Sequence, residues 1–524
     1  MLTTRLGYST VGYSSVGSAN TGDETVLSEH DVVIIGGGFS GLGMAIRLKE
    51  AGFDDFVILE RGDDVGGTWH FNTYPGCACD VPSHLYSFSF APNPAWTQTY
   101  SPQPEIDAYL KRLADDHGLR PHVRLDTTVT DAAYDEDDGR WTVETDGETF
   151  RGRVLVAAQG GLAEPKIPDI PGIDSFEGAT FHSARWDHSV DLRGKRVAAV
   201  GAGASAIQFV PAIQPDVAEL HVIQRTPPWV MPHPNRPTTR FERRLYKRFP
   251  AAQKLVRGAI YAGRELLVLG FAKDPRLMKV PERIALKHMR DQIGHRPDLM
   301  EKVTPDYTIG CKRILPSNGW YPALAEPNVS LHCGGVSEIR GNTIVAGDGS
   351  EAEVDAIVFG TGFQVADMPV GKFVRGRDGR TLDEVWQGSP KAYLGTTVAG
   401  FPNLFLMTGP NTGLGHSSMV YMIESQIAHV VGALSAMRAA GAETLEVRQE
   451  VQDAYNAEID AKMEGTVWNS GCASWYIDAT GRNATLWPDW TWRFRRRVAR
   501  FDASDYVLSA PVREKRFERE TVPA

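Results

Sequence analysis

The sequence is poor in cysteine, and the few that it has form no familiar pattern. Its five cysteines are odd in number and include no C-x-x-C pair: Cys77, Cys79, Cys311, Cys333 and Cys472. Cys77 and Cys79 are separated by one residue only, and no second pair completes a zinc site. We therefore expect structural thiols rather than a disulfide framework, no metal site, and a reducing, cytoplasmic location.

The sequence also lacks long apolar runs. Residues 258–272 form the longest apolar-looking stretch, but it is too short to span a bilayer and contains Arg264 and Glu265. The first 29 residues are rich in Ser, Gly and Thr and have no apolar segment typical of a secretory signal. We predict a mobile or loosely docked N-terminal arm and no membrane insertion.

The sequence also has fewer basic than acidic residues. The chain has 55 Lys and Arg against 65 Asp and Glu, a net charge of -10, which argues against nucleic acid as its main partner. A hydrophobic content of 42% with 23% charged residues is typical of a soluble globular protein. Because 524 residues exceed what one hydrophobic core supports, we expect two or three domains.

A dinucleotide-binding pattern begins near residue 32. The β-branched run 32–35 predicts a buried parallel strand, and an amphipathic helix to about residue 50 follows glycines in G-x-G-x-x-G spacing. A second strand, 56–59, ends at an acid that can accept hydrogen bonds from ribose hydroxyls. The residues expected to contact this dinucleotide are Gly36, Gly38, Phe39, Ser40, Gly41 and Glu60.

The pattern recurs from residue 196. Strand 196–200 leads into a second glycine turn and a helix, and strand 219–223 ends at Gln224, Arg225 and Thr226 instead of an acid. A guanidinium can pair with a 2'-phosphate that a carboxylate would repel, so this site predicts NADPH. The alternative is a surface arginine after an ordinary strand. The residues expected to contact the second dinucleotide are Gly201, Gly203, Ala204, Ser205, Ala206, Arg225 and Thr226.

Two dinucleotide sites on one chain indicate electron transfer from a nicotinamide to a second cofactor, for which FAD is the natural candidate. Strand-like stretches at 153–161 and 355–363 can return the chain to each unit, and 236–305 has the charge and periodicity of helices. We predict an α/β fold with two nested Rossmann-like domains and a helical insertion. The expected boundaries are an arm at 1–29, an FAD domain at 30–163 and 364–524, a linker at 164–187, an NADPH domain at 188–235 and 306–363, and the insertion at 236–305.

The predicted linker ends in FEGATFHSARWD, residues 176–187, which fits F-x-G-x-x-x-H-x-x-x-W-[PD] at every fixed position. A second stretch, GGTWHFNTYPGCACD at 66–80, fits G-G-x-W-x-x-x-x-[FY]-P-G-x-x-x-D. With these two signatures the chain resembles the type I Baeyer–Villiger monooxygenases from about residue 30 to near 492. The resemblance implies an enzyme that uses FAD, NADPH and O2 to convert ketones to esters or lactones through a C4a-peroxyflavin.

The resemblance also implies catalytic roles. Arg313, in the segment TIGCKRILP, matches the family's catalytic cation, and an arginine suits this task because it cannot lose its proton. Asp80 is expected to pair with it; a helix cap is the alternative. His182 is expected to couple cofactor binding to domain movement without touching the substrate, unless it is simply a core histidine. Further family positions are Gly67, Thr68, Trp69, Tyr86 and Val129 beside FAD, and Lys312 and Trp475 beside NADPH.

Other functions remain open on the residues alone. A heteroatom-oxidising flavin monooxygenase uses the same cofactors, although Trp186-Asp187 argues against it. A pyridine-nucleotide disulfide reductase needs a cysteine pair that the sequence lacks beside the flavin. A non-catalytic flavin-binding paralogue would lack the catalytic residues. The sequence does not identify the ketone, and either a monomer or a small homo-oligomer is compatible with it.

Overall fold

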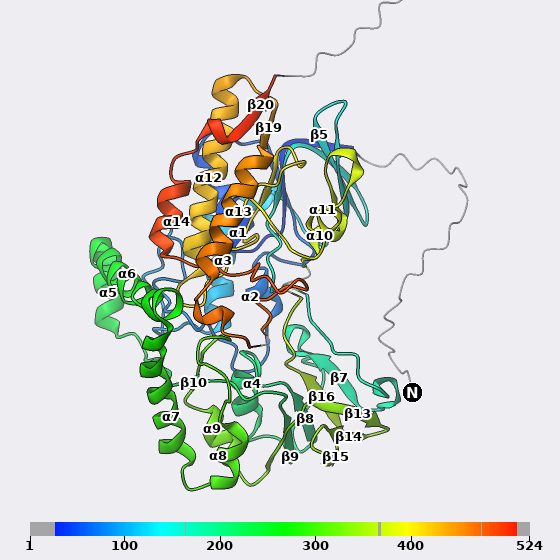
Figure 1. The fold of residues 1–524 in the computed structure, drawn as a ribbon, viewed down its shortest axis with the longest axis vertical. Coiled ribbons are helices and arrows are strands. Elements are labelled where there is room, and N and C mark those ends of the chain that lie inside the picture. Colours follow the sequence, from blue (N-terminus) through cyan, green and yellow to red (C-terminus); the bar gives the residue numbers. More distant parts are fainter. Residues whose placement is uncertain (1–26, 163, 365–367, 473, 511–524) are drawn as a thin grey trace, which may run out of the picture.

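A computed structural model of the chain describes residues 27–162, 164–364, 368–472 and 474–510. Two α/β units lie one above the other in Figure 1, each built on its own sheet. The predicted α/β class with two Rossmann-type units is confirmed. Most of the predicted arm, residues 1–26, lies outside the described residues, and residues 27–29 already belong to the first strand.

The first sheet has eight strands and a largely parallel centre. Its order is β17-β4-β5-β6-β1-β2-β3, and β18 also pairs with β6. Four consecutive buried residues, Val32 to Ile35, end the central strand, because a parallel strand covered on both faces needs apolar side chains on both. The strands are β1 (Leu27–Ile35), β2 (Phe56–Leu59), β3 (Val123–Arg124), β4 (Val129–Asp135), β5 (Arg140–Thr145), β6 (Thr149–Ala157), β17 (Val374–Arg375) and β18 (Leu404–Leu406).

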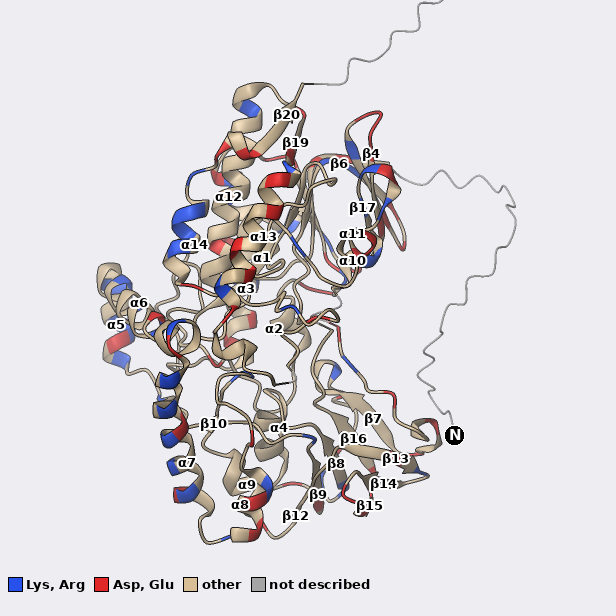
Figure 2. Ribbon diagram, viewed as in Figure 1, with Lys and Arg blue, Asp and Glu red and all other residues tan. Residues whose placement is uncertain are grey.

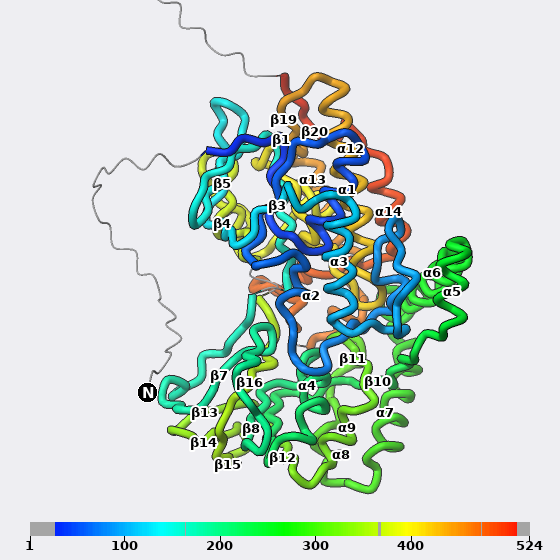
Figure 3. Tube along the Cα trace, turned by 180° about the vertical axis from the view of Figure 1, so that it is seen from behind, coloured from blue at the N-terminus to red at the C-terminus, as the bar shows by residue number. Residues whose placement is uncertain are grey.

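Helices from both ends of the chain cover this sheet. The long buried helix α12 packs against α1 and α14, so late segments complete the domain that the early strands begin (Figure 3). The return predicted at 153–161 overlaps the end of β6, and the one predicted at 355–363 contains β16 (Ala356–Phe359). The helices and the terminal strand pair of this unit are α1 (Phe39–Glu50), α2 (Thr68–Phe71), α3 (Gln103–Asp116), α10 (Val370–Phe373), α11 (Leu382–Trp386), α12 (Met419–Ala440), α13 (Gln449–Met463), α14 (Thr491–Val498), β19 (Thr444–Val447) and β20 (Tyr506–Ser509).

The second unit is built on a five-stranded sheet in the order β12-β9-β8-β16-β7. Its edge strand β7 comes from the segment predicted as a linker and pairs with β16 in parallel register. The elements are β7 (Ala179–His182), β8 (Arg196–Val200), α4 (Ala206–Ile213), β9 (Glu219–Ile223), β10 (Val230–Met231), β11 (Leu315–Pro316), α9 (Trp320–Ala325), β12 (Val329–His332), β13 (Val336–Arg340), β14 (Thr343–Ala346), β15 (Glu351–Glu353) and β16 (Ala356–Phe359).

The segment predicted as a helical insertion is helical. It contains α5 (Arg240–Arg248), α6 (Pro250–Glu265), α7 (Lys279–Ile293) and α8 (Pro297–Val303). A reciprocal capping box between Thr239 and Glu242 fixes the start of α5. In Figures 1 and 3 the pair α5 and α6 projects from the side of the molecule, next to the boundary between the two units. Within the described residues, no helix combines the length and apolar character that crossing a bilayer requires.

Candidate active site between two dinucleotide sites

The turn between β1 and α1 has no room for side chains. Gly36 has φ +103°, and a Cβ on Gly41 would lie 1.9 Å from the Gly36 carbonyl oxygen. The backbone of this turn can therefore approach a pyrophosphate, with the N-terminus of α1 directed at it. Phe39 and Ser40 form the first turn of α1, and both are buried.

Glu60 stands at the end of β2 and closes this turn. Its two carboxylate oxygens accept hydrogen bonds from the amides of Gly37 at 2.7 Å and Gly62 at 2.9 Å. Val129 starts β4, two residues after Thr127, whose amide donates to the Glu60 carbonyl oxygen at 3.0 Å. The structure thus brings Val129 to the same end of the sheet as the glycine turn and Glu60.

Buried polar atoms without partners lie at this same end of the first sheet. Within the described residues, no hydrogen-bond partner reaches the side-chain amide of Gln159 or the hydroxyl of Thr408. Both residues follow neighbouring strands, β6 and β18, whose carboxyl ends adjoin that of β1. Orphaned polar groups beside a glycine cradle fit a bound dinucleotide carrying a polar ring system. Sequence reasoning predicted neither residue as a cofactor contact.

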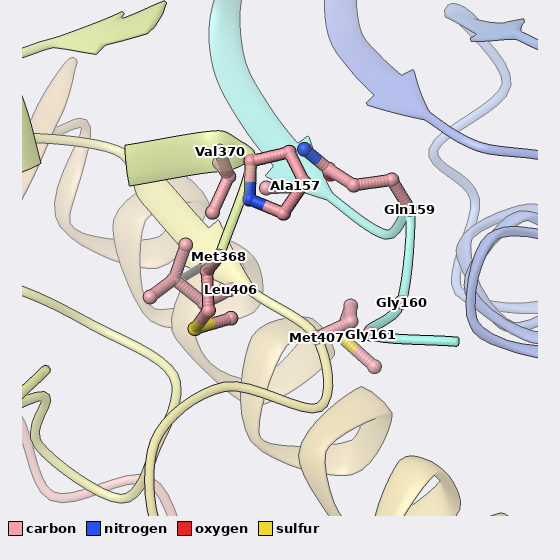
Figure 4. A pocket seen from close by; sticks show the side chains of 9 residues that line it. Ala157, Gln159, Gly160, Gly161, Met368, Val370, Leu406 and Met407 are labelled. Carbon is pink, nitrogen blue, oxygen red and sulfur yellow. The ribbon is translucent and has the colours of Figure 1, made fainter. Parts of the chain in front are cut away.

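Figure 4 shows a pocket under these two strand ends. Gln159 contributes to its wall, as do the main chains that continue β6 and β18. The residues that line it are Ala157, Gln159, Gly160, Gly161, Met368, Pro369, Val370, Leu406 and Met407. The cavity is mainly apolar and, at about 20 Å³, has room for little more than a water molecule.

The signature 66–80 leads from this site to the second unit. Trp69 donates from Nε1 to the Tyr86 hydroxyl at 3.1 Å, next to Gly67 and Thr68 at the start of α2. Further along, the Gln208 side chain on α4 donates to the Ala78 carbonyl oxygen at 2.9 Å. The signature therefore joins the two dinucleotide units.

Asp80, the last residue of that signature, is held by Arg313. The guanidinium donates from Nε and Nη2 to the two carboxylate oxygens at 2.7 and 2.6 Å, although the two residues are 233 positions apart. The side chains of Arg313 and Asp80 are 31% and 22% exposed. Burial would raise the pKa of the Asp80 carboxyl, but the charge and hydrogen bonds of Arg313 outweigh it and hold that pKa below its ordinary value. The Asp80 charge in turn raises the pKa of Arg313.

A second arginine reaches Asp80 from the insertion. Arg264, on α6, donates from Nη2 to the Asp80 carbonyl oxygen at 3.0 Å. Tyr476, which is fully buried, lies close enough to Arg313 for the guanidinium to act on its pKa, which burial raises to about 12. Sequence reasoning missed both residues, because neither belongs to a spaced motif.

A disulfide corrects the prediction that all five cysteines are thiols. Cys311 and Cys472 are bonded, with Cα atoms 6.3 Å apart, whereas Cys77, Cys79 and Cys333 are free. The bond joins the segment of Lys312 and Arg313 to the loop that carries Trp475 and Tyr476. The spacing of 161 residues gave no local pattern by which the pair could be recognised.

The second glycine turn is as tight as the first. Gly201 has φ +116°, and a Cβ there would lie 2.4 Å from the Gly360 carbonyl oxygen at the end of β16. Gly203 is open to its surroundings, with Ala204 exposed and Ser205 and Ala206 leading into α4. The N-terminus of α4 can accept phosphate as α1 does.

Arg225, just after β9, and Lys312, from a distant segment, are two neighbouring cations. Gln224 is buried in the place that Glu60 takes in the first unit, and Arg225 and Thr226 follow it. Burial, and next the nearby charge of Arg225, lower the pKa of Lys312. Within the described residues, neither Arg225 nor Lys312 forms a salt bridge with a carboxylate. Two neighbouring cations without a counter-ion fit a 2'-phosphate.

His182 ends β7 and is buried. Its Nδ1 accepts a hydrogen bond from the Ala184 amide at 3.1 Å, and its ring meets that of Phe363 edge-on at 5.9 Å. In the part of the chain that the structure describes, its Nε2 forms no hydrogen bond of regular geometry, although the Gly362 main chain is close enough to act on the ring. Burial lowers the pKa of His182 to about 4, so the ring is neutral near pH 7. Trp186, from the same stretch, packs between Phe181 and Phe209.

Comparisons with known proteins agree with two dinucleotide sites. Residues 33–260 match the family model described as pyridine nucleotide-disulphide oxidoreductase, a span that contains neither Cys311 nor Cys472. A Baeyer–Villiger monooxygenase of Streptomyces coelicolor is 53% identical over 92% of this chain and 93% of its own. One from Pseudomonas aeruginosa is 52% identical over 94% and 95%.

Solved structures with related sequences have the same fold. An oxidized steroid monooxygenase bound to NADP matches with a TM-score of 0.81 and 32% identity, over 92% of this chain and all of its own. A complex named OTEMO with FAD and NADP matches with 0.82 and 28%, over 92% and 99%. A closed structure of cyclohexanone monooxygenase matches with 0.82 and 27%, over 93% and 100%.

Proposed function

Because the chain belongs to the Baeyer–Villiger monooxygenases, we propose that Arg313 and Asp80 direct its oxygenation of a ketone between the two dinucleotide sites. The protein is an oxidoreductase that uses FAD and NADPH to insert one atom of O2 beside a carbonyl group. The two-point contact between Arg313 and Asp80 is the observation that carries the assignment of these residues.

FAD would be held in the first unit by the Gly36–Gly41 turn, with Glu60 toward its ribose and Gln159 and Thr408 near its ring system. The close approach that Gly41 allows and the unpartnered polar atoms of Gln159 and Thr408 support this placement. When bound, the flavin supplies electron transfer from the nicotinamide and the activation of O2. Trp69 and Tyr86 would cover one side of the group.

Arg313 would stabilise negative charge as it develops on the reacting oxygen atoms. Its proton cannot be removed near neutral pH, and Asp80 raises its pKa further, so the positive charge is permanent. Asp80 orients the planar guanidinium through two hydrogen bonds, and Arg264 holds the main chain of Asp80. A pre-oriented cation stabilises a charged transition state without having to reorganise during the reaction.

NADPH would lie on the Gly201–Ala206 turn, with its 2'-phosphate between Arg225 and Lys312 and beside Thr226. The absence of a protein carboxylate paired to either cation, within the described residues, supports this placement. The disulfide Cys311–Cys472 would keep the loop of Trp475 and Tyr476 over the same region and exclude water from it.

His182 would act as a positioning residue between the two units. The lack of a regular hydrogen bond at its Nε2, next to the Gly362 main chain, supports a role in which such a bond forms when the second unit turns. His182→Ala is then expected to bind FAD but to release less ester per NADPH consumed. If the variant loses FAD and its remaining holoenzyme couples normally, the residue is a structural core histidine.

The substrate class and the compartment are also proposals. We take cyclic and steroidal ketones as first candidates, because solved relatives are named cyclohexanone and steroid monooxygenase. We place the enzyme in the cytoplasm, as a monomer or a small homo-oligomer. The chain has one disulfide, beside the segment of Arg313, and three free cysteines. A secreted protein stabilised by disulfides would have more of them, whereas a single disulfide is compatible with a redox-sensitive protein of the cytoplasm.

A panel of linear, cyclic, aromatic and steroidal ketones tests the proposed substrate class. Each ketone is incubated with enzyme, NADPH and 18O2, and the product is identified by mass spectrometry. The expected product gains one labelled oxygen atom. An amine and a sulfide are incubated in the same way, and oxygenation of these two alone, with no ketone converted, would contradict the substrate assignment.

A further inference from the structure

Helix α6 presents its polar side to the protein and its apolar side to solvent. On the inner side, Gln253, Arg257, Tyr261 and Glu265 follow one another at intervals of four residues, which places them on one face. Gln253 donates to the Asn93 carbonyl oxygen at 2.8 Å, and Arg257 to those of His84 and Ser87, both at 2.7 Å. Glu265 accepts from Thr491. These polar contacts, together with the packing of Ile260 and Tyr261 against the core, hold the helix to the protein.

The outer face of α6 carries leucines and small residues. Ala251, Leu255, Ala259, Ala262 and Leu266 lie on one side of the helix and are all exposed. Leu255 is 76% exposed and Leu266 is 61% exposed. A surface helix of a globular protein has the opposite arrangement, so this face is suited to an apolar environment outside the molecule.

Exposed apolar residues are concentrated in the insertion. Of the fifteen large apolar side chains that are exposed in the described part of the chain, nine lie between residues 241 and 284: Phe241, Phe249, Leu255, Leu266, Leu267, Leu269, Leu277, Val280 and Ile284. They lie on α5, α6, α7 and the segments that join these helices. The exposed apolar side chains are therefore concentrated in this insertion rather than scattered over the molecule.

The same segment is strongly basic. Residues 240–290 contain fourteen Lys or Arg and four Asp or Glu, a net charge of +10 in a chain whose net charge is -10. Figure 2 shows the basic residues spread over α5, α6 and α7. Six of the nine exposed apolar residues directly follow a Lys or Arg: Phe241, Phe249, Leu255, Leu277, Val280 and Ile284.

From this arrangement we infer that the insertion docks on the surface of an anionic lipid bilayer. The apolar side chains reach the boundary of the acyl chains, while the neighbouring Lys and Arg extend to the lipid phosphates. The contact is peripheral, because no helix in the described residues can span a membrane. The projecting position of α5 and α6 in Figures 1 and 3 allows a flat surface to approach.

A second copy of the chain fits this surface less well. A two-fold symmetric contact would bring the basic segment of one copy against that of the other, even though Arg257 and Lys273 are paired with Glu424 and Asp489 outside it. Like charges facing each other across a contact oppose association, whereas anionic lipid neutralises them.

Cosedimentation of the FAD-loaded enzyme with lipid vesicles tests the inference without measuring activity. We expect strong binding to an equal mixture of phosphatidylcholine and phosphatidylglycerol, and weak binding to phosphatidylcholine alone. Binding should fall as salt is added. The absence of binding to the anionic vesicles at low salt would overturn the inference.

Two sets of variants separate the apolar from the electrostatic contribution. The double variant Leu255→Gln/Leu266→Gln is expected to reduce vesicle binding at least tenfold. In the triple variant Arg248→Gln/Lys254→Gln/Lys279→Gln, each cation removed is expected to weaken vesicle binding about fivefold. Leu27→Gln/Val507→Gln alters two exposed apolar residues outside the insertion and should bind as the parent does. Flavin absorbance and melting temperature confirm that each variant is folded.

Measuring the oligomeric state tests whether a second copy of the chain, instead of lipid, covers this surface. A concentration-dependent dimer that Leu255→Gln/Leu266→Gln dissociates, without vesicle binding by the parent, would show that a second copy covers the face. Equal loss of vesicle binding in Leu27→Gln/Val507→Gln would also contradict the proposed surface.

Discussion

Arg313 and Asp80 meet through two hydrogen bonds, of 2.7 and 2.6 Å, that join the FAD-side signature to the segment beside the NADPH site. Removal of the carboxylate in Asp80→Ala should leave a largely buried cation without its partner. We expect the free energy of unfolding to fall by about 1–3 kcal/mol, less than for a fully buried pair because both side chains are partly exposed. Urea denaturation followed by tryptophan fluorescence measures it.

The matched control for this change is Asp80→Asn, which keeps the shape and one acceptor. It should lose less stability than Asp80→Ala but still form less ester per NADPH, because the guanidinium loses its charged partner. If both variants form ester as efficiently as the parent, Asp80 has no part in positioning Arg313.

Arg225 is expected to determine the choice between NADPH and NADH. A charge-assisted contact contributes about 1.5–3 kcal/mol, so Arg225→Ala should reduce the ratio of kcat/KM for NADPH to that for NADH about tenfold or more. Arg193→Ala serves as the control, because Arg193 is exposed and pairs with Asp191 away from the proposed phosphate site. An unchanged ratio in Arg225→Ala would remove the residue from the 2'-phosphate site.

The disulfide should support the loop above Arg313. Denaturation without reductant should expose three titratable thiols rather than five. Cys311→Ser is expected to lower the free energy of unfolding by about 2–4 kcal/mol and to increase hydrogen peroxide released per NADPH, because the Trp475 loop is no longer tied down. Cys333→Ser is the control, and dithiothreitol should reproduce the effect only in proteins that contain both Cys311 and Cys472.

The buried histidines should make the fold sensitive to mild acid. His182 has a pKa of about 4 in the folded protein because of its burial, against about 6.5 when unfolded. The unfolded chain therefore binds a proton that the folded chain excludes, and stability decreases as pH falls from 6.5 toward 4. One such histidine lowers the free energy of unfolding by about 2 kcal/mol at pH 5; His84 and His429 act in the same direction.

Urea denaturation at pH 7 and pH 5 measures this dependence. His182→Gln should lessen the difference between the two pH values, whereas His188→Gln, which changes an exposed residue, should leave it as in the parent. An undiminished difference in His182→Gln would contradict a neutral, buried His182.

The sequence predicted the two dinucleotide units well, because their signals are local. The strand from Phe56 to Leu59, the helix ending at Glu50 and the strand from Arg196 to Val200 begin or end where the glycines and apolar runs indicated. A parallel strand buried on both faces is encoded by a run of consecutive apolar residues, and the turn after it by closely spaced glycines. These local patterns were sufficient to predict a two-unit α/β fold.

Contacts between segments far apart in the chain could not be predicted from the sequence. The disulfide joins residues 161 positions apart, and Arg264 reaches Asp80 from a different domain segment. Periodicity predicted the helices of the insertion, but it could not tell which face of α6 would meet the protein. The polar face did so because Arg257 and Glu265 find buried partners there.

The ester formed per NADPH consumed, compared between the parent enzyme, Arg313→Lys and Arg313→Ala, tests the central role of Arg313 most directly. We expect Arg313→Ala to bind FAD, to be reduced by NADPH and to consume O2, but to release hydrogen peroxide and to form ester about 100-fold or more slowly than the parent. Arg313→Lys should retain part of the ester formation, because it keeps the charge but not the two-point contact. Ester formation by Arg313→Ala at the parent rate and yield would contradict the account.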